Sequence, residues 1–518
     1  MTSLAIGGTV ALLVVLGLLS SKKVQGQNHN FAVAGRTLTV PLVAILLMSQ
    51  VIDSNATVGA ADLAGGFGFW AGAAMPLGIA VSFLLMGLFV AEKVRERELY
   101  SLPGYFRQTF GRTGEILCAV LTVSSFGILM AGNLVALGHM MDHFVGVPYW
   151  VAIVFVTVAI LAYTMLGGMF ASVYTGLFLM VVMAAGFVGL MLWMFLGPGY
   201  TAPEGLGISD LEQLTAPAAG AVINWATVFA LAFGNLVAID VFQRVSSSKN
   251  ARSARTAALI AAAGTVVLCV PLAAVAVAGT GLLGDSSSES PILFQLLTGH
   301  VPTPVAMLVI SALLAATLTT VSGILLATSS IVVGTILDTK KLRLSVLQAS
   351  RWAMVPVAAI GILVALRVNH TGILLTLTFD LLCASLVAPF VLSLWTRLVS
   401  TRALVTSAVL GLGVRLGFFV LTPTIYGVEN TLAYIPNEVV TTSVDGWTTF
   451  LAAVVSLVVY VAMAAADTQK AASTPAVDEP APDRDGGEDQ GPNRVPDSVA
   501  GSPASVGPDP SVEVPARP

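Results

Sequence analysis

The chain has 518 residues, of which 56% are hydrophobic and only 10% are charged, and its mean hydropathy is +0.89. A soluble domain of this length cannot have such a composition, because its surface requires many more charged residues. The sequence therefore indicates a polytopic membrane protein.

Apolar segments long enough to cross a bilayer, about 20 residues each, recur along the whole chain. The first has no basic residue before it and no small-residue cleavage site after it, so we interpret it as a retained helix and not as a signal peptide. The sequence predicts about 13 transmembrane helices, at 4–21, 39–66, 68–93, 116–140, 148–166, 171–197, 221–240, 255–279, 303–336, 349–367, 371–397, 402–421 and 447–466.

Part of the second segment, Leu47–Gly68, does not have the sequence of a plain lipid-spanning helix. Helix-breaking and polar residues at membrane depth occur only where the backbone is buried in protein or lines a wet cavity, and an ionisable residue there marks a functional site. We interpret the stretch as the broken helix of a secondary transporter. The alternative is two short helices joined by an outward-facing loop. The interrupting polar residues are Ser49, Gln50, Asp53, Ser54, Asn55, Thr57 and Asp62.

The basic residues gather in alternate loops, as the positive-inside rule requires. With the N-terminus outside, the inward loops contain most of the 24 Lys and Arg residues, and the outward loops at 141–147, 198–220, 280–302 and 424–446 contain none. This alternation predicts a multi-pass protein of the cell membrane whose C-terminal tail is cytoplasmic. From about Asp467 onward the sequence is rich in Ala, Pro, Gly, Ser and acidic residues, which predicts a disordered tail.

Five motifs, in this order along the chain, resemble segments of the sodium/solute symporter family, the group that contains sodium/proline and sodium/galactose transporters. The resemblance covers residues 30–400 approximately. The motifs are FAVAGR (31–36), LYSLPGYFRQTFG (99–111), YTMLGGMFASVYTG (163–176), FQRVSSSKNARSARTA (242–257) and SALLAATLTTVSGILLATSS (311–330).

The resemblance implies an all-α, LeuT-like core of two inverted five-helix repeats, formed by the second to sixth and the seventh to eleventh spans. The first helix of each repeat is broken, and AFGNLVAID (232–240) occupies the corresponding place in the second repeat. The expected organisation is an extra N-terminal helix (1–30), the transporter core (31–400), two C-terminal helices (401–466) and the tail (467–518).

The resemblance also implies a sodium site. It places Ser49, Ile52 and Ala316 as carbonyl donors, and Thr319 and Thr320 as hydroxyl donors. A hard cation prefers oxygen ligands, and the freed carbonyls of a broken helix supply them. Residues 316, 319 and 320 lie on one face of a helix, so one ion can contact all three. The alternative is that the two threonine hydroxyls bond back to their own helix.

One departure from the family pattern concerns the number of ions. Family members often carry Trp-Thr-Asp where this chain has Tyr174, Thr175 and Gly176. That aspartate is associated with ion release or with a second sodium site. Gly176 offers no carboxylate, so we expect a single bound sodium ion.

For the solute, the family's contacts on the broken helix select Gln50, Asp53 and Asn55. An unpaired carboxylate at this depth is costly, so Asp53 should neutralise a cationic group of the solute, help to hold the ion, or stay protonated. The first option favours amines, amino acids or amide-like solutes over simple sugars. Asp62 is expected to cap a helix or act at a gate, and Asn133 to make a packing hydrogen bond.

These features predict a sodium-coupled symporter that imports a small organic solute by alternating access. The alternative is a transporter-like solute sensor that acts through a partner, although the tail is no signalling domain. An enzyme is disfavoured, since the sequence contains no metal-ligand spacing, no nucleophile beside a base and no phosphate-binding loop. We expect no cofactor beyond sodium, a small solute and the lipid bilayer as partners, and no nucleic acid.

Arg415 in the twelfth span and Asp380 in the eleventh span are predicted at nearly the same depth. An unpaired arginine there is unfavourable. We expect Arg415 either to pair with Asp380 or to extend to the outer surface.

Overall fold

The structure is a computed structural model. It describes residues 36–99, 101–283, 290–336, 345–368, 370–423, 433–437, 439–441 and 444–473, together with short pieces at 7–9, 12 and 15. Every named element within these residues is helical. The predicted span 4–21, the motif residues 31–35 and most of the predicted tail lie outside the described residues.

The helices follow the predicted apolar segments closely. They are α3 (Val40–Val51), α4 (Ser54–Phe67), α5 (Phe69–Leu85), η2 (Met86–Val90), α6 (Ala91–Glu96), α7 (Leu102–Val145), α8 (Tyr149–Leu196), α9 (Glu212–Thr215), η3 (Pro217–Ala219), α10 (Ala221–Gly234), η4 (Asn235–Val237), α11 (Ile239–Ser246), α12 (Ala251–Leu283), α13 (Ile292–Gly299), α14 (Thr303–Ile331), η5 (Val332–Ile336), α16 (Val346–Ala365), α17 (Ile373–Leu382), η6 (Cys383–Val387), α18 (Ala388–Trp395), α19 (Thr401–Leu421) and α20 (Asp445–Ser473).

The number of spans is not confirmed as 13. Within the described residues nine helices are long and apolar enough to cross a membrane, and there are up to 11 if each bent pair counts as one span. The long helix α8 contains two of the predicted segments, as a shorter apolar part at Tyr149–Met165 and a span at Val173–Leu196. The multi-pass, all-helical architecture is confirmed.

Several element boundaries differ from the prediction, and two of the differences have a clear cause in the sequence. The inward loop predicted before residue 116 contains the start of α7, and Gly111, with φ 74° and ψ −166°, separates this short part from the long helix. A positive φ of this kind favours glycine. At the other end, α20 continues to Ser473 and not to 466, because the alanine-rich sequence after the apolar segment has a high helix propensity.

The predicted span 39–66 is interrupted, as expected. The axes of α3 and α4 differ by 55°, and Asp53 accepts a hydrogen bond from the Ala56 backbone nitrogen at 2.7 Å, which starts α4 as a new helix. The alternative of an outward-facing loop is wrong, because Ile52 and Asp53 are both buried. The corresponding break in the second repeat is also present: η4 and Ala238 separate α10 from α11, with a 50° bend.

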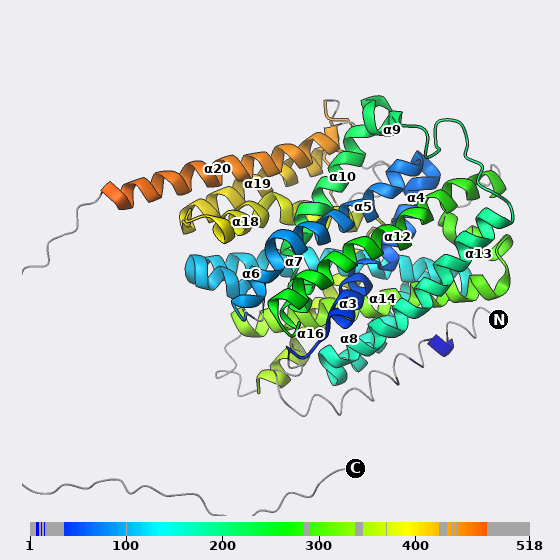
Figure 1. Cartoon of the computed structure of the whole chain (residues 1–518), viewed down its shortest axis with the longest axis horizontal. Coiled ribbons are helices and arrows are strands. Elements are labelled where there is room, and N and C mark those ends of the chain that lie inside the picture. Colours follow the sequence, from blue (N-terminus) through cyan, green and yellow to red (C-terminus); the bar gives the residue numbers. More distant parts are fainter. Residues whose placement is uncertain are drawn as a thin grey trace, which may run out of the picture. The chain divides into compact units, whose positions relative to one another are not determined.

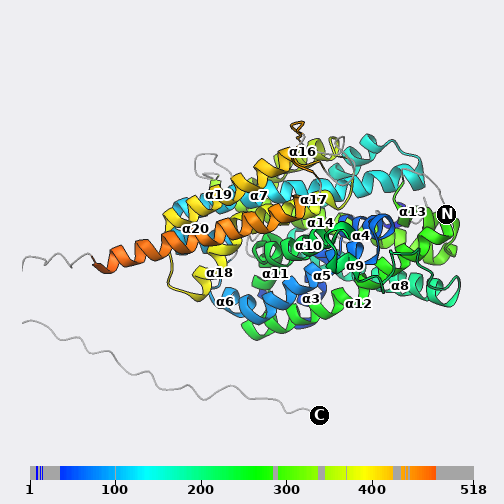
Figure 2. The same cartoon turned by 90° about the horizontal axis from the view of Figure 1, so that it is seen from above.

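The broken helices lie inside the bundle. Helix α3 packs against α8, α12 and α14, and α4 packs against α5 and α12. Figure 1 shows α3 beside α12 and α4 beside α5. Helices α19 and α20 run side by side along one flank in both views (Figures 1 and 2). The interruptions therefore meet protein and not lipid.

The predicted pairing of Arg415 with Asp380 is confirmed, since Arg415 Nε donates to Asp380 Oδ2 in the buried interior. A second carboxylate takes part, because Arg415 also donates from Nη2 to Asp445 Oδ1 at 3.0 Å and from Nη1 to Thr448 Oγ1 at 3.3 Å. This cluster joins α17, α19 and α20. The participation of Asp445 was not predicted, because the last span was expected to begin at residue 447.

Arg415→Lys is expected to lower the thermal stability of the protein in detergent. Lysine keeps the charge but cannot donate in a fork to two carboxylates and a hydroxyl, and each lost charged hydrogen bond contributes about 1.5–3 kcal/mol. The measurement is the melting temperature, with Arg402→Lys at the exposed start of α19 as the matched control. Equal melting temperatures for the two variants would show that the forked hydrogen bonds of Arg415 do not stabilise the protein.

Candidate functional site

The five residues predicted to hold sodium are all buried, with relative exposures of 0 to 2%. They come from two helices that contact each other directly at the first break. Thr320 Oγ1 of α14 donates to the Gln50 backbone carbonyl at the end of α3, at 3.3 Å. The loosened carbonyls of α3 and the hydroxyl-bearing face of α14 therefore lie against each other.

The Thr319 hydroxyl is the most informative atom of this group. It is fully buried and has no hydrogen-bond partner among the described residues. Other hydroxyls of α14 bond back to their own helix, such as Thr328 to the Ile324 carbonyl at 2.6 Å, but Thr319 and Thr320 do not. An unpaired buried hydroxyl is unfavourable and requires an explanation. An oxygen with free lone pairs in this position is suited to a cation.

Gly176, at the position where the family resemblance leads one to expect an aspartate, lies beside the same group of residues. A Cβ atom added at Gly176 would lie 2.8 Å from Ser49 Oγ and 3.1 Å from Leu46 Cδ2. Position 176 on α8 is thus adjacent to the predicted carbonyl donor Ser49. The glycine allows close packing of α8 against α3 and supplies no carboxylate at this edge of the group.

Two of the three predicted solute residues, Gln50 and Asp53, line a small internal cavity. Its wall also contains Asp240 from α11 and Phe379 from α17, so both helix breaks contribute a carboxylate. Its other lining residues are apolar: Val51, Ile79, Leu129 and Leu375. Asn55 does not line the cavity; its Oδ1 accepts from the Gly372 backbone nitrogen at 2.7 Å.

Asp53 is held by two donors. Its Oδ1 accepts from the Ala56 backbone nitrogen at 2.7 Å, and its Oδ2 accepts from Asn133 Nδ2 of α7 at 2.6 Å. The side chain is 1% exposed. Asn133 therefore makes the packing hydrogen bond expected of it, and that bond fixes the orientation of the Asp53 carboxylate.

Both ends of the Gln50 side chain contact protein. Its Nε2 donates to the Thr320 carbonyl at 3.1 Å, and its Oε1 accepts from Arg244 of α11. Arg244 Nη1 also donates to the Asp240 carbonyl at 3.0 Å. Gly323 makes this arrangement possible, because a Cβ atom there would lie 2.8 Å from Arg244 Nη2. Gln50 thus connects the Thr319–Thr320 face of α14 with the second broken helix.

Asp62 lies on α4 but caps the N-terminus of another helix, α13. Its Oδ1 accepts from the Ile292 backbone nitrogen at the start of α13, at 3.0 Å, and its Oδ2 accepts from Thr371 Oγ1 at 3.4 Å. It therefore ties α4 to α13 and to the segment before α17.

The structure adds residues that the sequence analysis did not assign to the site. Asp240 had a usable signal, because it lies within the second interrupted segment as Asp53 lies within the first. Arg244 belongs to a recognised motif but gave no indication of its depth. Phe379 and Asn133 gave no local signal, since their contribution depends on how α17 and α7 pack.

Solved structures define the class of fold. The chain aligns with a sodium-coupled sialic acid symporter, solved in a substrate-bound outward-open state, with a TM-score of 0.68 and 16% identity over 90% of this chain and 97% of that one. It aligns with Mhp1, a nucleobase-cation-symport-1 family transporter, with a TM-score of 0.55 and 16% identity over 86% and 96% of the two chains. The third is MhsT in complex with L-phenylalanine, with a TM-score of 0.53 and 14% identity over 81% and 97%. The fold is the LeuT-like fold of membrane transporters.

A family model gives the narrower assignment. The model of the sodium:solute symporter family matches residues 31–411, and the chain therefore belongs to this family. Among curated proteins, it is 24% identical to high-affinity choline transporter 1 of Drosophila melanogaster over 50% of this chain and 42% of the relative. It is 26% identical to the human protein of that name over 40% and 36%. The chain spans less than half the length of each of these two relatives.

Proposed function

We propose that this protein is a sodium-coupled symporter that imports a small organic solute by alternating access. The observation that carries the proposal is the buried, unpaired Thr319 hydroxyl on α14 beside the broken end of α3. Family membership supports it, because the family is one of sodium:solute symporters.

We assign the sodium ion to the carbonyl oxygens of Ser49, Ile52 and Ala316 and to the hydroxyls of Thr319 and Thr320. A hydroxyl has one donor and two lone pairs, so Thr320 can ligate the ion while it still donates to the Gln50 carbonyl. One ion is expected, because Gly176 provides no carboxylate at the adjoining edge.

The side chains that line the cavity between the two breaks suit a cationic solute. Asp53 and Asp240 both line it, and neither is on the surface. The buried Arg244 lies one turn after Asp240 on α11 and compensates its charge, so Asp53 is the carboxylate that favours a positively charged guest. Phe379 offers an aromatic side chain that can contact an ammonium group. The curated relatives are named as choline transporters. We therefore propose an organic ammonium compound as the solute, with Gln50, Asp53 and Asn55 retained as its candidate contacts.

Alternating access requires the broken helices to move relative to their neighbours. Gln50 joins α3 to α14 through Thr320, and joins both to α11 through Arg244. A sodium ion shared by α3 and α14 would hold the same two helices together. The ion and the Gln50 contacts would thus stabilise one arrangement of the inner half-helices.

The N-terminus is assigned to the outside and the tail to the cytoplasm, following the distribution of basic residues.

The proposal is tested by uptake into proteoliposomes of labelled choline, proline, galactose and pyruvate, each with a sodium gradient, with a proton gradient and with neither. Sodium-dependent accumulation of choline or another amine is the expected result. Accumulation driven by protons alone would overturn the sodium assignment. Sodium-driven uptake of galactose or pyruvate but not of amines would overturn the solute assignment.

Gln50→Leu is expected to raise the sodium concentration for half-maximal uptake by about tenfold, with a smaller change in the solute concentration for half-maximal uptake. The reason is that the Gln50 amide contacts Thr320 and Arg244, and each hydrogen bond to a neutral or charged group contributes about 0.5–3 kcal/mol. The two concentrations, measured on the same preparation, act as controls for each other. A change confined to the solute would instead make Gln50 a solute ligand only.

A further inference from the structure

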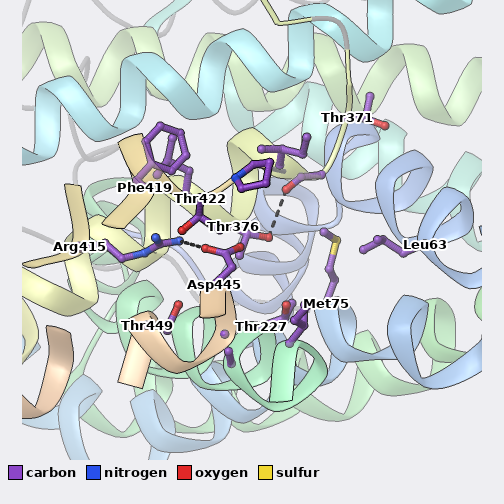
Figure 3. Close-up of a pocket in the computed structure, with 17 residues that line it drawn as sticks. Leu63, Met75, Thr227, Thr371, Thr376, Arg415, Phe419, Thr422, Asp445 and Thr449 are labelled. Carbon is purple, nitrogen blue, oxygen red and sulfur yellow. Dashed lines mark hydrogen bonds and ion pairs between the residues drawn. The ribbon is translucent and has the colours of Figure 1, made fainter. Parts of the chain in front are cut away.

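A second and larger pocket lies between the core and the two C-terminal helices. It has a volume of about 810 Å³, including the open space at its mouth. Its walls come from α4, α5, α10, α17, α19 and α20, and Figure 3 shows polar side chains from several of these helices around it. The site described above does not use this pocket.

Helix α17 separates the pocket from the solute cavity. Leu375 and Phe379 line the cavity, whereas Ile373, Thr376 and Leu377 line the pocket. The two spaces are therefore one helix apart and have no lining residue in common. A molecule in the pocket would not contact Asp53 or Asp240 directly.

The charged cluster at the pocket contains more carboxylates than basic groups. Arg415 is the one basic residue that lines it in the described part of the chain, and its guanidinium contacts two carboxylates, Asp380 and Asp445. With all three ionised, the cluster has one negative charge in excess. Asp380 is 1% exposed and Arg415 is 5% exposed, but the Asp445 side chain is 37% exposed. The excess charge is thus accessible at Asp445.

The rest of the wall favours an organic cation over a hydrated metal ion. Phe419 lines the same pocket, and its ring centroid lies 5.9 Å from Arg415 Cζ. Leu63, Met75 and Ile373 add apolar surface. A carboxylate beside an aromatic ring and apolar side chains is the environment that alkylammonium groups prefer.

We propose that this pocket binds a small organic cation, with its ammonium group beside Asp445 and Phe419. The pocket is a second site, one helix away from the solute cavity, and it does not depend on the transport activity proposed above. With the topology predicted from the basic residues, the pocket lies at the outer side of the membrane, where a cation could bind before it enters the cavity.

The experiment measures the charge preference of the pocket by thiol labelling. Thr227→Cys places a thiol in its wall, and the unmodified full-length chain, with its own three cysteines, gives the background. The purified protein is treated with methanethiosulfonates that carry a trimethylammonium, a hydroxyethyl or a sulfonate group. Rates are normalised to those of a small free thiol. The cationic reagent is expected to react about tenfold faster than the anionic one, because one uncompensated charge lies nearby.

Asp445→Asn is expected to abolish most of this preference, and Asp445→Glu to preserve it. Glu204→Gln, at an exposed loop residue outside the pocket, is the matched control and should leave the preference unchanged. Equal rates for the three reagents before any change at Asp445 would overturn the proposal. A preference that survives Asp445→Asn would overturn it as well.

Protection of the introduced thiol by a bound cation distinguishes this pocket from the solute cavity. Tetramethylammonium is expected to slow labelling of Cys at position 227 equally in the chain with Asp53 and in the Asp53→Asn variant. Loss of protection in Asp53→Asn would mean that the cation binds in the solute cavity and would overturn the second site. If Asp445→Asn does not fold, Phe419→Leu leaves the ion pairs intact and should weaken the protection severalfold; unchanged protection would contradict the proposal.

Discussion

Replacing Thr319 and Thr320 together by alanine is expected to raise the sodium concentration for half-maximal uptake by at least about tenfold. Both hydroxyls are fully buried, and neither bonds back to its own helix. Each contact to a charged partner contributes about 1.5–3 kcal/mol, so the loss of two should weaken sodium binding strongly. The solute concentration for half-maximal uptake at saturating sodium should change much less.

The neighbouring pair on α14 provides a matched control. Thr328 and Ser329 are equally buried, but their hydroxyls donate to the Ile324 and Leu326 carbonyls of the same helix. The Thr328→Ala and Ser329→Ala double variant should therefore keep the sodium dependence of the unmodified protein. If the two double variants behave alike, the sodium assignment on α14 is wrong.

The polar residues of the first broken helix were sufficient to predict its interruption, whereas the second interruption was implied by the family resemblance. A run of apolar residues that contains Ser, Gln, Asp and Asn cannot face lipid, and this conclusion needs no knowledge of the neighbouring helices. The Arg415–Asp380 pair was predictable for a related reason, since depth along two adjacent spans follows from counting residues. In both cases the apolar interior of the membrane restricts where polar and charged residues can lie.

The side-chain partners at the site were not predictable in the same way. Gln50 and Arg244 are 194 positions apart, and Asp53 and Asn133 are 80 apart. Their contacts depend on the rotation of each helix about its axis and on the close approach of α14 permitted by Gly323. A sequence pattern defines the faces of single helices but not which faces meet. The same limit explains why Phe379 and the pocket beside Asp445 emerged only from the structure.

Asp53→Asn is expected to reduce uptake of a cationic solute at least about a hundredfold. The substitution preserves the size of the side chain and an oxygen that can accept from the Ala56 nitrogen, as Asp53 Oδ1 does, but it removes the negative charge. At a separation of about 4 Å, a charge pair contributes about 4 kcal/mol at an effective dielectric constant of 20. A hundredfold loss corresponds to about 2.7 kcal/mol.

Two further measurements distinguish loss of the Asp53 charge from a structural effect of the Asp53→Asn substitution. Asp62→Asn, the same carboxylate-to-amide change at a half-buried residue of α4, should leave solute recognition intact, because Asp62 contacts Ile292 and Thr371 and does not line the cavity. Binding of 3,3-dimethylbutanol, an uncharged analogue of choline, should be weakened much less by Asp53→Asn than binding of choline, because the analogue has no positive charge for Asp53 to neutralise. Equal losses for choline and its uncharged analogue would mean that Asp53 acts by capping α4 and orienting Asn133, and that the solute's positive charge is recognised elsewhere.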